Sequence, residues 1–120
     1  MTDESVWRPL DSSVREVVTA FLRAENERDW DRYRSLLADD VEWTLMRPSP
    51  RVVHGAEEYM STIQSFYEKD SKASFQIVQI VVDEEQGVAF AELDMAGRRS
   101  VDVFAVRGGR IALEREYFGY

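Results

Sequence analysis

The sequence contains no cysteine, and this absence excludes disulfide bonds and thiolate chemistry. A chain without cysteine is typical of a reducing compartment, so we expect a cytoplasmic location. No stretch is long and apolar enough to span a bilayer. The first five residues, Met-Thr-Asp-Glu-Ser, lack the basic and apolar segments of a signal peptide.

Positive charge is scarce, because 15 Lys and Arg residues face 23 Asp and Glu residues, giving a net charge of -8. Nucleic acids and anionic membranes need a basic face, so we expect neither as a partner. The sequence also lacks a dinucleotide or phosphate fingerprint, and we expect no organic cofactor. With one histidine and acids scattered along the chain, we expect no metal.

The chain has enough hydrophobic residues to form one core. Its 120 residues fit one domain, and 44% of them are hydrophobic, with a 12% share of aromatic residues. Residues 1–10 read as a loose leader ahead of that domain.

Helical periodicity dominates the first half. Asp11-Ser12-Ser13 followed by Glu16 predicts a capping box at the start of a helix. Asp29 predicts a second helix cap. A strand follows by alternation, and Gly55 precedes a third apolar helical face. The expected elements are helices over 14–25, 30–38 and 56–67, and strands over 41–45 and 52–54.

The second half alternates with a period of two and is punctuated by turn residues. The acidic run at 83–85 reads as a solvated hairpin tip, and Gly108-Gly109 as a tight turn. The expected strands cover 75–82, 88–95, 100–106 and 111–118. Helices first and a strand meander afterwards indicate an α+β fold, with the helices on one face of a curved antiparallel sheet.

Three segments resemble a known superfamily: "FLRAENERDWDRYRSLLADDVEW", "HGAEEYMSTIQSFYE" and "SVDVFAVRGGRIALEREYF". Together they resemble the nuclear-transport-factor-2-like superfamily, and within it the SnoaL-like polyketide cyclase and ketosteroid-isomerase-like group. The resemblance implies a single domain over 1–120, with three N-terminal-half helices on the concave face of a cone-shaped curved antiparallel sheet (a cystatin-like roll). It also implies an apolar pocket and a homodimer. Members include cyclases, isomerases, epoxide hydrolases, dehydratases and domains without demonstrated chemistry.

The resemblance also suggests catalytic acids. Asp102, in Val-Asp-Val-Phe, matches the acid/base aspartate of SnoaL-like cyclases, although the histidine that those cyclases have on the preceding strand is missing. In limonene-epoxide-hydrolase relatives, an arginine and two aspartates occupy similar places. Here Glu92 stands at the arginine position, and Asp94 and Glu116 keep the two acid positions. The base of ketosteroid isomerases would fall near Leu45, which cannot abstract a proton.

The strand period leaves the direction of two of these acids open. Phe90, Glu92 and Asp94 share one face of their strand, while the opposite face is apolar from Ala89 to Met95. If the apolar face packs on the core, the acids point to solvent or to a dimer interface. If the family resemblance sets the orientation, they line the cavity. Asp102 has a similar alternative, as an exposed strand residue paired with a neighbouring arginine.

Several residues are candidates for binding a flat organic ligand, although each also fits an ordinary structural role. His54 is the single histidine of the sequence, and it also fits a loop before a helix. The candidates are Trp43, His54, Tyr59, Phe66, Phe90, Phe104 and Phe118.

Two functions follow. The first is an enzyme of the isomerase, cyclase or hydrolase type, with Asp102, Glu116, Asp94 or Glu92 as acid and base acting on an apolar, oxygen-bearing small molecule. The second is a non-catalytic dimeric module that binds an apolar ligand or only assembles. A hollow cavity with convergent acids would favour the enzyme, and a filled interior would favour the module.

Overall fold

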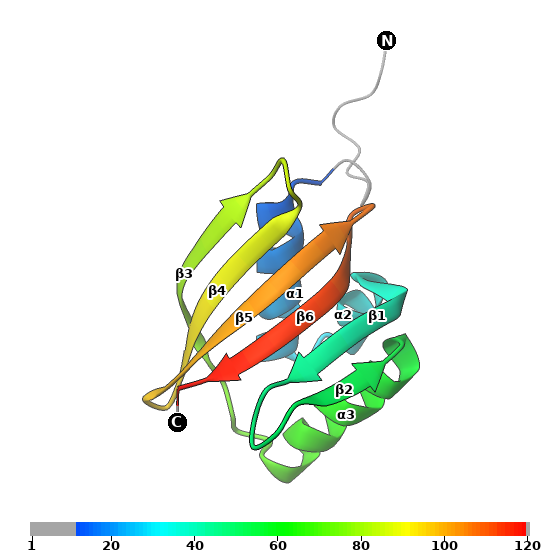
Figure 1. Cartoon of the computed structure of the whole chain (residues 1–120). Helices are drawn as coiled ribbons and strands as arrows, with labels where there is room; N and C mark the ends of the chain where they lie inside the picture. The colour runs from blue at the N-terminus through cyan, green and yellow to red at the C-terminus, as the bar shows by residue number, and fades with distance from the viewer. Residues whose placement is uncertain (1–11, 120) are drawn as a thin grey trace.

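A computed structural model describes residues 12–119, so the predicted leader over 1–10 lies outside the described residues. The described chain forms three helices and six strands, with the helices packed against one side of a single curved sheet (Figure 1). This arrangement confirms the α+β class expected from the order of helical and alternating segments.

Helix α1 (Val14–Glu27) begins at the predicted capping box. The hydroxyl oxygen of Ser13 accepts the Glu16 N–H at 3.1 Å, and the Glu16 carboxylate accepts the Ser13 N–H at 3.0 Å. Two of the four N–H groups that open a helix end are thereby paired. The helix buries one face, from Val14 to Ala24, against the sheet.

Helix α2 (Trp30–Ser35) is shorter than its apolar spacing predicts. The chain already leaves the helix at Leu36, whose carbonyl accepts the Ile111 N–H at 2.7 Å, and Leu37 then pairs with Ile111 in the sheet. Leu36 and Leu37 are buried. Apolar residues at these positions fit a helix and a strand equally well, so the sequence spacing could not show that strand pairing replaces the last helical turn.

The sheet has the order β2-β1-β6-β5-β4-β3. Four of its pairings in the described chain are antiparallel, as expected, and β1 runs parallel to β6, which makes the sheet mixed. The long connection through α3 makes this parallel neighbour possible. The remaining elements are β1 (Leu37–Leu45), β2 (Arg51–His54), α3 (Ala56–Lys69), β3 (Gln76–Asp83), β4 (Val88–Met95), β5 (Arg98–Arg107) and β6 (Arg110–Phe118).

The acidic hairpin between β3 and β4 is more than a solvated tip. Glu84 accepts the backbone N–H groups of Val14 at 2.8 Å and Arg15 at 3.1 Å. A carboxylate at this place pairs two further orphan donors of α1 and interacts favourably with the helix dipole. The hairpin therefore fastens the start of α1 to the edge of the sheet.

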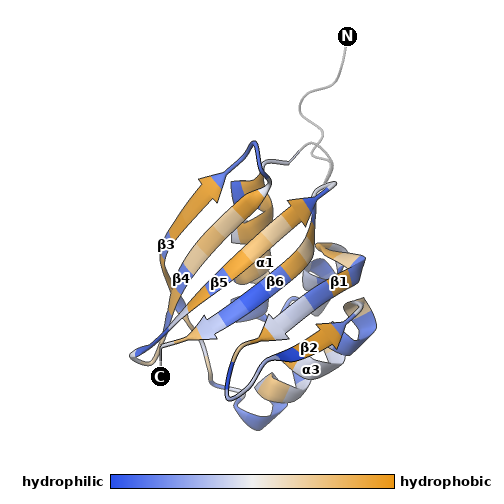
Figure 2. Ribbon diagram, in the orientation of Figure 1, coloured by the Kyte–Doolittle hydropathy of each residue, from blue (hydrophilic) through white to orange (hydrophobic). Residues whose placement is uncertain are grey.

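Hydropathy alternates along most strands, but β6 has a continuous hydrophilic stretch through its middle (Figure 2). That stretch is Glu114-Arg115-Glu116, and β6 is a central strand with neighbours on both sides. Polar side chains on the helix-covered face of a central strand need partners or a cavity. Between residues 12 and 119, no helix is long and apolar enough to cross a membrane.

Candidate functional site

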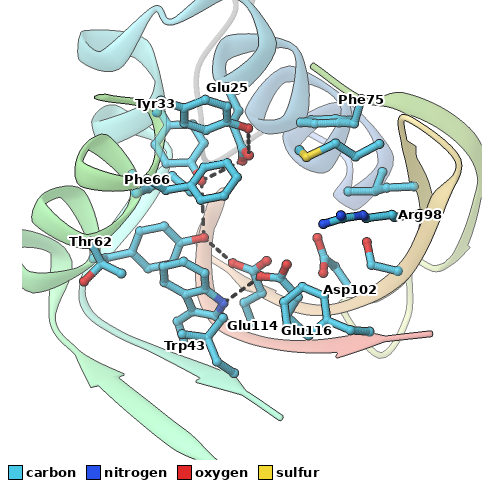
Figure 3. A pocket seen from close by; sticks show the side chains of 18 residues that line it. Glu25, Tyr33, Trp43, Thr62, Phe66, Phe75, Arg98, Asp102, Glu114 and Glu116 are labelled. Atoms are coloured by element: carbon cyan, nitrogen blue, oxygen red, sulfur yellow. Dashed lines mark hydrogen bonds between the residues drawn. The ribbon is translucent and has the colours of Figure 1, made fainter. Parts of the chain in front are cut away.

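A cavity of about 260 Å³ lies between the sheet and the helices (Figure 3). Apolar and aromatic side chains from α2, α3 and the strands make most of its wall. Four carboxyl groups also line it, namely those of Glu25, Asp102, Glu114 and Glu116. An apolar cavity with a few convergent polar groups is the usual form of a small-molecule site.

Strand register brings three of these acids together. Asp102 of β5 lies directly opposite Glu116 of β6, and Phe104 lies opposite Glu114. Side chains two residues apart on a strand share a face, so Glu114 and Glu116 point to the same side as Asp102. One carboxylate oxygen from each of these three residues lies within 4.8 Å of the other two. We call Asp102, Glu114 and Glu116 the acid cluster.

The acid cluster is withdrawn from water. Asp102 and Glu114 are each 4% exposed, and Oδ1 of Asp102 has no hydrogen-bond partner among the described residues. The three oxygens would also suit a hard divalent cation, whose ligands are carboxylates at such spacings. The expectation of no metal assumed that the acids are scattered, and the fold groups three of them.

Burial raises the pKa values of the whole cluster. For Asp102, burial and then repulsion from Glu116 and Glu114 raise the pKa well above its ordinary range. For Glu114, burial and then Glu116 have the same effect. For Glu116, burial and then Glu25 raise the pKa to about 7, while the Trp43 indole N–H opposes the rise by donating to Oε1 at 3.1 Å. Like charges opposite one another in the ladder cannot all ionise without a large cost.

A buried file of hydroxyl groups joins the acid cluster to Glu25 across the cavity wall. Tyr59 donates to Glu114 in a short hydrogen bond, the hydroxyls of Tyr33 and Tyr59 are 3.3 Å apart, and Tyr33 lies 3.0 Å from Glu25 Oε1. Three links need three protons, and two hydroxyl groups supply two. Because Tyr59 donates to Glu114 and Tyr33 then donates to Tyr59, the third proton must come from the Glu25 carboxyl group.

The Glu25 end of this file is braced by α3 and by the end of α1. The Tyr67 hydroxyl donates to Glu25 Oε2 at 2.6 Å, and the Arg28 guanidinium lies 3.7 Å above the Tyr67 ring. Burial raises the pKa of Glu25, while the hydrogen bonds from Tyr67 and Tyr33 and the charge of Arg28 act in the opposite direction. Both ends of the file are thus carboxyl groups that bind protons more tightly than usual.

Six residues predicted for the site line the cavity. Asp102 and Glu116 are there among the acids, and the Trp43 and Tyr59 rings stack with their centres 4.5 Å apart. Phe66 and Phe118 complete this set. Their roles in catalysis or binding stay predictions, and their position in one cavity is now established.

Five other predicted site residues do not line the cavity. The apolar face of β4 packs inward, so Glu92 and Asp94 point outward, where both pair with Arg99. Phe90, on the same outward face, is 50% exposed. Phe104 is fully buried core, and exposed His54 lies 3.4 Å from Glu42. The family resemblance placed Glu92 and Asp94 on the wrong side, because alternation repeats every two residues and does not fix which face is inward.

The sequence analysis did not select Glu114 and Glu25. Glu114 shares the strand face of Glu116, so the selection of Glu116 already implied it. Glu25 lies four residues after Phe21 and seven after Val18 on the buried face of α1, a position where an acid is unusual. An acid at a core position of a helix was the signal that could have identified it.

The SnoaL-like domain family matches residues 18–114 of the sequence, which is most of the chain. This chain belongs to the SnoaL-like domain family. The match includes Asp102 and Glu114, and it confirms the resemblance that the three sequence segments indicated. No curated protein matches the sequence.

Solved structures resemble this SnoaL-like domain throughout. The candidate polyketide cyclase IdmH of Streptomyces antibioticus has a TM-score of 0.77 at 15% identity, covering 90% of this chain and 93% of its own. A candidate ketosteroid isomerase of Kribbella flavida has a TM-score of 0.76 at 20% identity, covering 89% and 78%. An LEH-like epoxide hydrolase of M. tuberculosis has a TM-score of 0.67 at 25% identity, covering 88% and 81%. The SnoaL-like domain thus has the nuclear-transport-factor-2-like fold and relatives that are enzymes.

Proposed function

We propose that this SnoaL-like domain is an enzyme that moves a proton on an apolar, oxygen-bearing small molecule, without an organic cofactor, as an isomerase, cyclase or hydrolase. One observation carries the proposal: three carboxyl groups converge within 4.8 Å in an aromatic-lined cavity. Acids placed so close together hold their protons with different strengths, and a pair with separated pKa values can supply both an acid and a base.

Glu116 is the base in this proposal, since burial brings its pKa to about 7, where it is half ionised at neutral pH. Asp102 is the acid, because burial and its two acidic neighbours favour its protonated form. Glu114, held by Tyr59, positions Asp102 and lets the cluster share protons.

With a carbonyl substrate, the proposed reaction proceeds through an enol. The Glu116 carboxylate takes a proton from the carbon next to the carbonyl group, and the electron pair of that C–H bond forms a carbon–carbon double bond. The carbonyl oxygen accepts the proton of Asp102, which gives an enol. Where the substrate also has a carbon–carbon double bond conjugated with the enol, Glu116 returns the proton to the far carbon of that double bond, the enol proton goes back to Asp102, and the shifted double bond completes an isomerisation.

The non-catalytic module remains the second candidate function, and the hollow interior is the observation that speaks against it. A domain that only assembles has no need for three acids in a cavity of about 260 Å³. Buried acids that lie close together reduce stability, and such costs usually occur at functional sites.

The test is hydrogen exchange on a panel of apolar ketones in D₂O, read by proton NMR, together with loss of apolar epoxides. We expect the wild-type protein to exchange the protons next to the carbonyl group of at least one ketone. Asp102→Asn and Glu116→Gln should stop this exchange, whereas the exposed hairpin variant Glu85→Gln should keep it. Ligands that bind without exchange or ring opening would instead support the module.

We also propose that the protein is a cytoplasmic homodimer. Four large apolar side chains lie exposed on the outward face of neighbouring strands β3 to β6, and a second copy could cover them. Register places Val81 opposite Phe90, and Val101 opposite Tyr117.

A further inference from the structure

We propose that the natural ligand of this cavity has a protonated basic nitrogen, which sits on the acid cluster between the carboxylates and the aromatic wall. The inference rests on the proposed function, since it names the class of substrate for the same cavity. It adds that the apolar, oxygen-bearing molecule is an amine, with the ammonium group between the Glu116 carboxylate and the acceptor Oδ1 of Asp102.

The first argument is the imbalance of charge around the cavity. Four acids line it, and among the described residues that line it Arg98 is the single basic one. In a protein interior, charged groups are found paired, and acids without a cation stay protonated. A ligand with its own positive charge would offset part of this excess of acids and would allow Glu116 to ionise.

The second argument is an unused acceptor. Oδ1 of Asp102 is withdrawn from water and accepts no hydrogen bond among the described residues, although Asp102 is 4% exposed and lines the cavity. A buried acceptor without a donor destabilises the folded protein. Figure 3 shows the Asp102 carboxylate at the cavity, next to Glu116. An ammonium N–H group on a ligand would supply the missing donor.

The third argument is the composition of the wall. Aromatic faces attract cations, and indole attracts them most strongly. One lining ring already holds a cation, because the Arg28 guanidinium lies 3.7 Å from the centre of Tyr67. The Trp43 indole and the Glu116 carboxylate are joined by a hydrogen bond, so one ammonium group can approach both. The lining rings are Tyr33, Trp43, Tyr59, Phe66, Tyr67, Phe75 and Phe118.

The linkage between proton release and ligand binding predicts how the affinity for an amine changes with pH. A bound ammonium group favours ionised carboxylates, so binding releases a proton, and affinity rises as the pH rises. Glu116 has a pKa of about 7, so its ionised fraction, and with it the affinity, increases about tenfold between pH 6 and pH 8. The titratable and charged groups that line the cavity with Glu116 come from every layer: Glu25, Tyr33, Tyr59, Tyr67, Arg98, Asp102 and Glu114.

The experiment compares an amine, an amide and two divalent cations on the intact protein by calorimetry and thermal shift. N,N-Dimethylbenzylamine is a cation at pH 8 and below, N,N-dimethylbenzamide is a neutral molecule of similar size, and Mg²⁺ and Mn²⁺ test a metal. At pH 8 we expect the amine to bind at least about tenfold more tightly than the amide, and to lose about tenfold in affinity at pH 6.

Variants assign the effect to the cluster. Asp102→Asn should remove the preference for the amine and keep amide binding, which also shows that the variant folds. Glu116→Gln should remove the pH dependence, and Glu85→Gln should change neither. Equal binding of amine and amide would overturn this inference, and so would displacement of the amine by a divalent cation. Ketone exchange without a preference for amines would leave the proposed enzyme standing, so the two failures can be told apart.

Discussion

At the scale of single residues, Asp102 and Glu116 face one another across the β5–β6 ladder, an arrangement that opposes folding at neutral pH. Burial raises the pKa of Glu116 from its ordinary value of 4.5 to about 7. The folded state therefore retains a proton that the unfolded chain has already lost between these two values. Stability is greatest below pH 4.5 for this group, and it is lost as the pH rises towards 7.

Removing this charge should stabilise the protein. A glutamine at position 116 can still accept the Trp43 indole N–H through its amide oxygen. We expect Glu116→Gln to increase the free energy of unfolding by about 3 kcal/mol at pH 8 and by little at pH 4.5, from the size of the pKa shift. Urea unfolding at the two pH values measures this. An equal effect at both would mean that the charge is not the cause.

The same residues should show the opposite effect on turnover. Asp102→Asn and Glu116→Gln each remove a group that donates or accepts a proton, and such groups contribute about 10²- to 10⁴-fold to a rate. We expect losses of that size in the exchange of ketone protons, with far-ultraviolet circular dichroism unchanged. A fully active Asp102→Asn protein would remove Asp102 from the mechanism.

At the scale of elements, the β3–β4 hairpin supports α1 through Glu84, which accepts two N–H groups of the first helical turn. We expect Glu84→Ala to lower the free energy of unfolding by about 1 kcal/mol, the usual contribution of a helix cap. Glu85→Ala is the matched control, since that exposed neighbour lies in the same loop. Equal losses in both variants would indicate a general effect of loop charge.

Elements were also the part of the fold that the sequence determined best. The capping box at Ser13 and the alternating strands β3 to β6 depend on local chemistry, and the sequence was enough to predict them. The parallel contact of β1 with β6 depends on residues about 70 positions apart, and no local pattern encodes it. Local alternation also does not show which face of β4 points to the core. Glu92 and Asp94 were therefore assigned to the cavity although they point outward, whereas Asp102 and Glu116 do line the cavity.

At the scale of the whole molecule, two groups of acids respond to pH in opposite directions. Burial raises the pKa values of Glu25, Asp102, Glu114 and Glu116, so their contribution to stability falls as the pH rises. Hydrogen bonds lower the pKa values of the surface acids Glu16, Asp39 and Glu92, whose contribution is lost as the pH falls below about 4.5. We expect the melting temperature to be highest near pH 5 and to decline through pH 8. A rise from pH 5 to pH 8, measured by calorimetry, would contradict the buried acid cluster.

The outward face of the sheet makes a second prediction at this scale. If a second copy covers Phe90 and its exposed apolar neighbours, a charge placed there must weaken the dimer. We expect Phe90→Glu to sediment as a monomer at concentrations where the wild-type protein is a dimer, with the amine and amide affinities of the cavity unchanged. A wild-type protein that is monomeric at high concentration would refute the dimer.

The place of β6 between β1 and β5 has a consequence for how the protein is made. Trp43 and Glu116, which are joined by a hydrogen bond, are 73 residues apart, and β6 is the last strand of this sheet in chain order. Until it leaves the ribosome, a nascent chain has two open strand edges that invite wrong partners. The acid cluster forms only when this central strand inserts, so binding competence arises at the same moment as the completed fold.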